Sequence, residues 1–427
     1  MKKKSIKHYD FTRKPKKPSR FWMTIGRWFA INPRLRRYKY VVRKIKMEGI
    51  KPPYLLFATH ASMLDFPLMY KAIAPYYANN VVAIDAIRDV GDYLMHELGC
   101  ICKRKFVRDP SLIRNIHYCL NDLNDIVCIY PEARYTLDGT TQFLPSSLGK
   151  MAKYANVPIV VLRMYGTYLA SPQWNKPEQV VPLAAELECV ATAEEAKTLS
   201  AQELNERIFH AMQRDDYEYQ RKNSIELDYP KRADGLHHIL YQCPHCGTEF
   251  KMYSEGTRLW CASCGKGWQV SKLNTLSAEE GETEFEFIPD WVKWERQNVR
   301  AEVRSGSYRF EGEVTVHTLP NAKRFYDQGR GKLVQTFEGT RLTCKAYGEE
   351  KELFWTAQEL ESVHIEYDYP FRKDKYKKNI FGDCIDISEQ DDSYWLHPVD
   401  KRDRLTKFSL ATEEIYVYAL ERMREKD

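Results

Sequence analysis

The chain lacks a hydrophobic run long enough to cross a bilayer. A membrane-spanning helix needs about 18 or more consecutive apolar residues, and no stretch of the 427 residues reaches that length. The longest apolar segment near the N-terminus, residues 21–31, is short, contains an arginine and leads into Asn32-Pro33-Arg34 instead of a small-residue cleavage site. We therefore expect no spanning helix and no signal peptide, and a cytoplasmic protein.

The composition also lacks the bias of a disordered or fibrous chain. Hydrophobic residues make up 43% of the sequence and charged residues 29%, which is ordinary for globular proteins. Glycine and proline occur only 20 times each, and no internal repeat is present. At this length, such a composition favours two or three globular domains.

Acidic residues are scarce at the N-terminus. Residues 1–50 contain Asp10 and Glu48 against 17 lysines and arginines, whereas the other 377 residues contain 57 acidic and 48 basic side chains. A basic segment on an acidic body predicts an anionic partner, either nucleic acid or an anionic membrane surface. Residues 1–20 are polar and interrupted by prolines, so we expect a disordered arm there.

Residues 20–47 alternate aromatic and basic side chains at roughly helical spacing. Asn32-Pro33 should divide this segment into two short helices. Basic residues on one helix face and Trp22 and Phe29 on the other are typical of a helix lying in a membrane interface. The alternative is that these helices only pack on the next domain. We assign residues 1–47 to an interfacial region and expect peripheral attachment to the inner face of the membrane.

Residues 48–235 carry the pattern of an α/β domain. Short apolar runs at 54–58, 81–84, 126–130 and 158–163 indicate buried strands, and helical patterns separate them. Strands that alternate with helices predict a mainly parallel sheet covered by helices.

Two matched Cys-x2-Cys pairs predict a metal site. Cys243 and Cys246 form the first pair, and Cys261 and Cys264 follow after 14 intervening residues. Four thiolates close a tetrahedral site with no open position, so the predicted Zn²⁺ is structural. Residues 236–280 therefore resemble a zinc ribbon. Two dithiol redox pairs are the alternative.

Residues 285–427 are dominated by short alternating strands. These strands are separated by glycine, aspartate and asparagine turns, and a helix at 413–424 closes the chain. Helical patterns are mostly absent from this region before that closing helix. The order of elements predicts an antiparallel β-rich domain that resembles a pleckstrin-homology-like sandwich. This C-terminal half is expected to bind a protein or lipid-headgroup partner.

A histidine and an aspartate follow the first predicted strand of the α/β domain. His60 comes directly after the strand at 54–58, and Asp65 lies five residues later. Open α/β sheets bind ligands at the carboxyl ends of their strands, and histidine is a base near neutral pH. Asp65 can fix the tautomer of His60 if His60 lies in the loop and Asp65 in the first helical turn.

Four motifs in order resemble those of the glycerolipid acyltransferases, the family of 1-acylglycerol-3-phosphate acyltransferases. They are His60-x4-Asp65, the Gly-x-Ile segment 99–105, Tyr-Pro-Glu-Ala-Arg-Tyr-Thr at 130–136 and Val-Pro-Ile-Val-Val at 157–161. The resemblance extends over residues 20–215, about half of the chain. The sequence departs from the family pattern at Thr59, Ala133, Arg134 and Val161, which leaves the acceptor class open.

The resemblance implies acyl transfer to a lipid. His60 would take the proton of the acceptor hydroxyl, with Asp65 behind it, and the hydroxyl would attack the thioester of acyl-CoA or acyl carrier protein. The expected acceptor is a lysophospholipid, first of all 1-acylglycerol-3-phosphate, which gives phosphatidic acid. The expected substrate-binding residues are Arg104 or Lys105 with Arg134 for the phosphate, and Glu132 to orient Arg134 or the acceptor hydroxyl.

Two alternatives remain open at this stage. The same chemistry serves another lipid acceptor, such as an aminolipid or a glycolipid. Alternatively, the ribbon and the basic arm belong to a non-catalytic protein that binds nucleic acid or protein, in which His60 and Asp65 are structural. The ordered motifs favour the acyltransferase and make a nucleic-acid partner unlikely.

Overall fold

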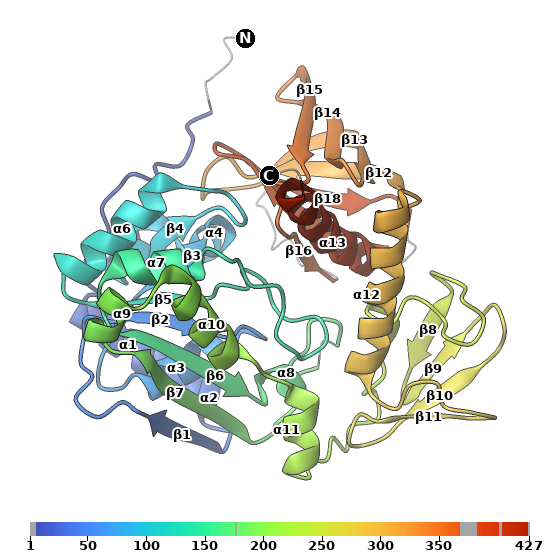
Figure 1. Ribbon diagram of the computed structural model, residues 1–427, viewed down its shortest axis with the longest axis horizontal. Helices are drawn as coiled ribbons and strands as arrows, with labels where there is room; N and C mark the ends of the chain where they lie inside the picture. Colours follow the sequence, from blue (N-terminus) through green and yellow to red (C-terminus); the bar gives the residue numbers. More distant parts are fainter. Residues whose placement is uncertain (1–5, 176, 368–381, 401–403, 426–427) are drawn as a thin grey trace. The chain divides into compact units, whose positions relative to one another are not determined.

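The computed structural model describes residues 6–175, 177–367, 382–400 and 404–425 (Figure 1). The chain divides into two compact units. The first unit comprises Met1–Pro172, Glu178–Ile225 and Pro320–Lys323, and the second comprises Gln173–Pro177, Glu226–Leu319 and Arg324–Asp427. Among the described residues, no helix is both long and apolar enough to cross a membrane.

A seven-stranded sheet with the order β1-β7-β6-β2-β5-β3-β4 forms the centre of the first unit. Its strands are β1 (Tyr40–Ile45), β2 (Leu55–Ala58), β3 (Ala78–Ala83), β4 (Ile101–Lys103), β5 (Ile126–Ile129), β6 (Ile159–Tyr165) and β7 (Leu183–Ala191). Only the β6–β7 pair is antiparallel. The predicted, mainly parallel sheet is therefore confirmed. The central strands β2 and β5 are buried along their full lengths, as expected for a sheet covered on both faces.

Helices cover this sheet, and some of them begin at residues whose side chains cap the helix. They are α3 (Asp65–Ala72), α4 (Ile84–Val90), α5 (Asp92–Glu97), α6 (Pro110–Asn121), α7 (Leu148–Ala155), α8 (Thr167–Ala170), α9 (Ala193–Thr198), α10 (Ala201–Met212) and α11 (Asp216–Lys222). Capping boxes start α9 and α10. Gly149 lets α7 approach α10, because a Cβ there would lie 1.9 Å from the Ala201 carbonyl oxygen.

The N-terminal helices differ from the prediction. The chain forms one helical run through α1 (Arg20–Gly26), the π-helical turn η1 (Arg27–Ile31) and α2 (Asn32–Leu35). Pro33 lies in the first turn of α2, where a missing N–H group is tolerated, so the run is not broken. The predicted second helix is wrong, because residues 40–45 form β1. Its β-branched residues pair in parallel with β7, a partner far away in the sequence.

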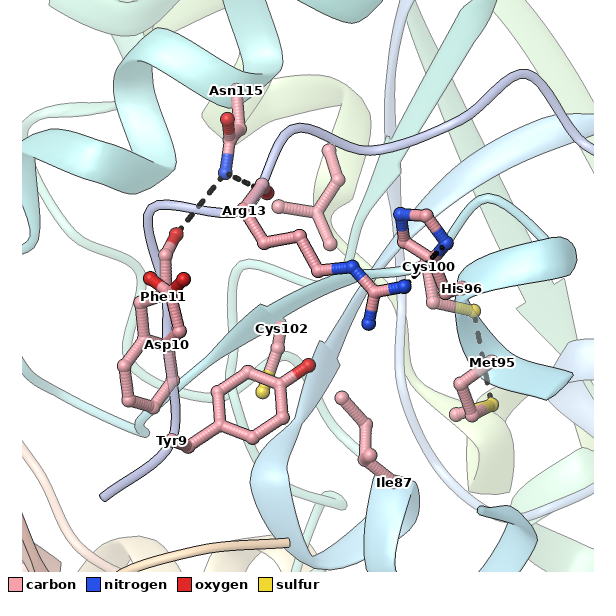
Figure 2. A pocket seen from close by; sticks show the side chains of 11 residues that line it. Tyr9, Asp10, Phe11, Arg13, Ile87, Met95, His96, Cys100, Cys102 and Asn115 are labelled. Atoms are coloured by element: carbon pink, nitrogen blue, oxygen red, sulfur yellow. Dashed lines mark hydrogen bonds between the residues drawn. The ribbon is translucent and has the colours of Figure 1, made fainter. Parts of the chain in front are cut away.

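Residues 6–19 lie on the surface of the first unit, contrary to the expected disordered arm. The buried side chain of Asn79 donates to the Lys16 carbonyl oxygen at 2.7 Å, and Asn115 donates to the Phe11 carbonyl oxygen at 3.3 Å. Figure 2 shows Asn115 reaching this segment above a small hollow lined in part by Tyr9 and Cys102. These bonds satisfy main-chain groups of the arm, which a composition argument does not anticipate.

The second unit contains two antiparallel sheets. The small sheet has the order β11-β10-β9-β8 and consists of β8 (Met252–Glu255), β9 (Arg258–Cys261), β10 (Gly267–Val270) and β11 (Leu276–Ala278). The larger sheet, in the order β15-β14-β13-β12-β18-β17-β16, consists of β12 (Phe310–Thr318), β13 (Tyr326–Thr336), β14 (Gly339–Ala346), β15 (Glu349–Thr356), β16 (His364–Glu366), β17 (Cys384–Ser388) and β18 (Ser393–Pro398). The predicted antiparallel β-rich domain is confirmed.

The second unit also contains two long helices. The closing helix α13 (Leu405–Arg424) begins earlier than the predicted start at residue 413. The helix α12 (Ile288–Ser305) is not predicted, since the sequence pattern indicates mostly strands after residue 285. Its buried residues nevertheless recur at helical spacing, as in Trp291, Glu295 and Val299. A buried stripe opposite a charged exposed face is the ordinary pattern of an amphipathic helix, so the sequence carries the signal of α12.

Candidate active site

The end of β2 places His60 beside Asp65. The chain leaves the sheet after Ala58 and turns, and Asp65 is the first residue of α3. His60 Nδ1 lies 2.9 Å from Asp65 Oδ2. Asp65 is fully buried, whereas the side chain of His60 is 23% exposed. The structure thus brings the two predicted catalytic residues into contact at the carboxyl end of a central strand.

The carboxylate of Asp65 is held in its ionised form. Burial opposes ionisation, but the bonds from His60 and from main-chain N–H groups hold the pKa of Asp65 below its usual value. Ala61 N and Ser62 N donate to the same oxygen, Oδ2, at 2.5 and 2.9 Å. An ionised carboxylate at this distance assigns the proton to Nδ1 of His60, which leaves Nε2 as the basic atom.

Two tyrosines from the third motif pack against the imidazole. The ring centroids of Tyr130 and Tyr135 lie 4.3 and 4.4 Å from that of His60. Both follow β5, the strand next to β2 in the sheet. They restrict the orientation of the His60 ring. Both residues belong to the third motif, but the sequence predicted no role for either.

Glu132 contacts the main chain of His60. It is 1% exposed, and Oε1 accepts a hydrogen bond from His60 N at 3.0 Å while Oε2 accepts one from Gln142 N at 3.1 Å. Burial raises its pKa, and the positive charge of Arg214 opposes that shift. Arg134 is also buried and donates to Gln142 Oε1 at 3.0 Å. Gln142 therefore bonds to two of the four predicted substrate-binding residues, Glu132 and Arg134.

Arg104 and Lys105 lie at the end of β4, which is separated from β2 by β5 and β3. Three strand spacings correspond to roughly 14 Å. Arg104 is 3% exposed; its guanidinium lies over the Phe11 ring at 5.1 Å and donates to the Pro320 carbonyl oxygen at 3.2 Å, both within the first unit. Lys105 Nζ lies 3.6 Å from Asp85 Oδ2. These two residues are thus placed at a different strand end from His60.

Sequence reasoning missed Arg214 and Asp216. Both are fully buried, and Arg214 Nη2 donates to the His60 carbonyl oxygen at 3.2 Å. Residues 192–222 carry a strong helical pattern, whereas the structure ends α10 at Met212 and begins α11 at Asp216. Asp215 caps α11 by accepting a hydrogen bond from Glu218 N at 2.8 Å, so the sequence marks the start of this helix but does not indicate that the connection reaches the site.

Part of the chain that carries this site matches a known protein family. Residues 36–165 match the family described as Acyltransferase. This segment is an acyltransferase domain. It contains His60, Asp65 and Glu132, and it ends before Arg214.

No curated protein matches the chain. Among solved structures, the chain is similar to the 1-acyl-sn-glycerophosphate (LPA) acyltransferase PlsC from Thermotoga maritima. The two are 15% identical with a TM-score of 0.35, over 44% of this chain and 78% of that chain.

The second unit carries the four cysteines that follow the acyltransferase domain. The sulfur atoms of Cys243, Cys246, Cys261 and Cys264 all lie within 4.8 Å of one another. Each pair closes a turn in which a glycine with positive φ, Gly247 or Gly265, donates its N–H to the first cysteine's carbonyl oxygen at 2.9 Å. Four converging sulfur atoms are a donor set that fits a tetrahedral metal ion.

Proposed function

We propose that the chain transfers an acyl group from acyl-CoA or acyl carrier protein to the free hydroxyl of a lysophospholipid. The first candidate acceptor is 1-acylglycerol-3-phosphate, and its product is phosphatidic acid. The observation that carries the proposal is the 2.9 Å contact between His60 Nδ1 and Asp65 within the acyltransferase domain. This contact prepares a base on a residue that remains partly exposed.

The proposed reaction needs no nucleophile from the protein. Nε2 of His60 takes the proton of the acceptor hydroxyl while the oxygen attacks the thioester carbonyl carbon. Asp65 stabilises the imidazolium that forms. The carbon–sulfur bond then breaks, an ester remains on the acceptor, and the imidazolium returns the proton to the leaving thiolate.

We assign the acceptor phosphate to the basic residues at the end of β4. Guanidinium and ammonium groups bind phosphate oxygens directly. Because Phe11 covers the guanidinium of Arg104, phosphate binding there requires the arm to shift, whereas Lys105 would exchange its ion pair with Asp85 for one with the phosphate. The buried bond between Arg134 and Gln142 favours a supporting role for Arg134.

Acyl transfer on vesicles tests the proposed function. Wild-type protein would be given acyl-CoA or acyl carrier protein donors and a panel of acceptors: lysophosphatidic acid, its monoacylglycerol without phosphate, and an aminolipid. We expect product from lysophosphatidic acid and much less from monoacylglycerol, because only the former carries the phosphate. Transfer to the aminolipid alone would keep the chemistry and replace the acceptor. No transfer to any acceptor by folded protein would contradict the proposal.

An exposed aromatic face supports a working position at the membrane surface. Phe21, Trp28 and Phe29 are 66%, 67% and 80% exposed, whereas Met23 and Ile31 on the same helical run are buried against the first unit. The basic residues Arg36 and Lys39 that follow this run are also exposed. Exposed aromatic and basic side chains together are typical of interfacial anchors.

Removing the aromatic anchor should weaken binding to anionic vesicles. Each large side chain that inserts contributes about 1.5 to 3 kcal/mol, so the Trp28→Ser/Phe29→Ser variant should bind roughly 10²- to 10⁴-fold more weakly. Co-sedimentation with phosphatidylglycerol vesicles measures this. Tyr154→Ser, which removes a 53% exposed aromatic side chain from α7 of the first unit, is the matched control. Equal vesicle binding by both variants would exclude the anchor. Deleting residues 1–47 is less informative, because it also removes β1.

We also propose that the four cysteines bind a structural Zn²⁺. Cysteine thiolates in two short turns are the common donor set of such sites. The second unit would then serve as a partner-binding module for a protein or a lipid headgroup.

A further inference from the structure

The connection between α10 and α11 reaches the main chain of His60 from outside the matched acyltransferase segment. Arg214 Nη2 donates to the His60 carbonyl oxygen at 3.2 Å. The same guanidinium lies 3.8 Å from Glu132 Oε2 and 3.8 Å from Asp216 Oδ2, and all three side chains are fully buried. Three ionisable side chains thus form a buried cluster next to the main chain of His60.

We propose that Arg214 is a positioning residue for His60. This inference rests on the proposed function, in which His60 is the base. Glu132 accepts the His60 N–H, while Arg214 Nη2 and Thr136 N donate to its carbonyl oxygen, the latter at 3.0 Å. Both main-chain polar groups of one residue are therefore fixed by buried partners. Such support limits how far the imidazole can move relative to Asp65.

The supporting arginine is itself held firmly. Arg214 N donates to Thr141 Oγ1 at 2.7 Å, and Thr141 N donates to the Arg214 carbonyl oxygen at 3.1 Å. Asp216 Oδ1 accepts a hydrogen bond from Gly166 N at 2.6 Å, at the end of β6. The connection is thereby fastened to the loop after Glu132 and to the central sheet. A displacement of His60 would strain several buried bonds.

Stability alone is a weak reason for this cluster. Removing charges from water is costly, and well-packed apolar residues often replace a buried ion pair without loss. A guanidinium, however, presents several donors in one plane and can approach two carboxylates and a carbonyl oxygen together. A lysine at the same position would keep the positive charge but would lose the planar set of N–H donors of the guanidinium. The arginine is therefore suited to holding a backbone in place.

The test compares Arg214→Met and Arg214→Lys with the wild type. If Arg214 positions the base, Arg214→Met should lower kcat about 100-fold with little change in KM, because a small misplacement of a catalytic group has that effect. Arg214→Lys should recover part of the loss. The matched control is Arg296→Met in α12, which removes an arginine, 27% exposed, that pairs with the buried Glu413 and Glu414 in the second unit.

A second readout does not depend on acyl transfer. Diethyl pyrocarbonate modifies neutral imidazoles, and mass spectrometry gives the rate at His60, whose ring lies between Tyr130 and Tyr135. Arg214→Met should be modified faster than the wild type, Arg214→Lys should be intermediate, and Arg296→Met should match the wild type. If Arg214→Met does not fold, Arg214→Lys supplies the comparison.

Two results would overturn the inference. One is a folded Arg214→Met protein with wild-type kcat and wild-type modification of His60. The other is a variant that is less stable but shows unchanged kcat and modification, which would make Arg214 a structural residue only. Failure of the proposed function looks different, because the wild type itself would then transfer no acyl group, while the modification rates would still report on positioning.

Discussion

Replacing His60 with alanine is expected to lower kcat for acyl transfer by roughly 10²- to 10⁴-fold, the usual contribution of a general base. The imidazole would no longer take the proton of the acceptor hydroxyl, so a weakly nucleophilic alcohol would have to attack the thioester. The measurement is product formation from the acceptor that the wild type uses best. KM should change little, because His60 acts on the reacting proton and not on the acceptor phosphate.

Asp65→Asn should produce a comparable loss by a different route. The amide side chain of this variant would keep the shape of the carboxylate but lose the negative charge that fixes the His60 tautomer and stabilises the imidazolium. His117→Ala, on the partly exposed surface of α6, is the matched control and should keep wild-type activity. Wild-type turnover by a folded His60→Ala protein would exclude the proposed mechanism.

Removing the metal should unfold the ribbon. Its sheet consists of strands of three or four residues, and so small a structure rarely folds without a metal or disulfides. Structural Zn²⁺ contributes an apparent binding free energy of about 10 to 16 kcal/mol to such modules. We expect a Cys243→Ser/Cys261→Ser variant to lose one equivalent of zinc and to expose Trp268, which is fully buried in β10.

Metal analysis and tryptophan fluorescence measure these two effects. Chelation of the wild-type protein should reproduce the fluorescence change of the double variant. Cys189→Ser is the control, because Cys189 is a buried cysteine in β7, far from the four-cysteine group in the sequence. A zinc-free protein with an intact ribbon, or a double variant that retains zinc, would contradict the assignment.

Much of the fold could be predicted because its signals are local. Buried strands such as β2 and β5 are continuous apolar runs, and their short length distinguishes them from the helices between them. The spacing of the four cysteines predicts a metal site, because two cysteines can bind one ion only if the chain between them forms a tight turn. The position of His60 after a strand likewise follows from the order of elements.

The errors arose where a distant partner decided the structure. Residues 40–45 form a strand because β7 pairs with them, and residues 6–19 lie on the first unit because buried asparagine side chains bind their main chain. Neither partner is visible in the local composition. Helix α12 is a different case, because its buried stripe recurs at helical spacing opposite polar and charged positions; the signal is local, and the prediction of mostly strands there is wrong.

The sequence by itself determined the chemistry available at the site: a histidine, an aspartate and a glutamate in motifs of fixed order, and four cysteines at metal-binding spacing. Only the tertiary structure decided what each group does. The tertiary structure directs the Glu132 carboxylate to the His60 N–H group and the Arg214 guanidinium to the His60 carbonyl oxygen. It also packs the Arg104 guanidinium over the ring of Phe11. The physical reason is that a buried charge takes its role from the partners that compensate it, and those partners come from other strands and helices.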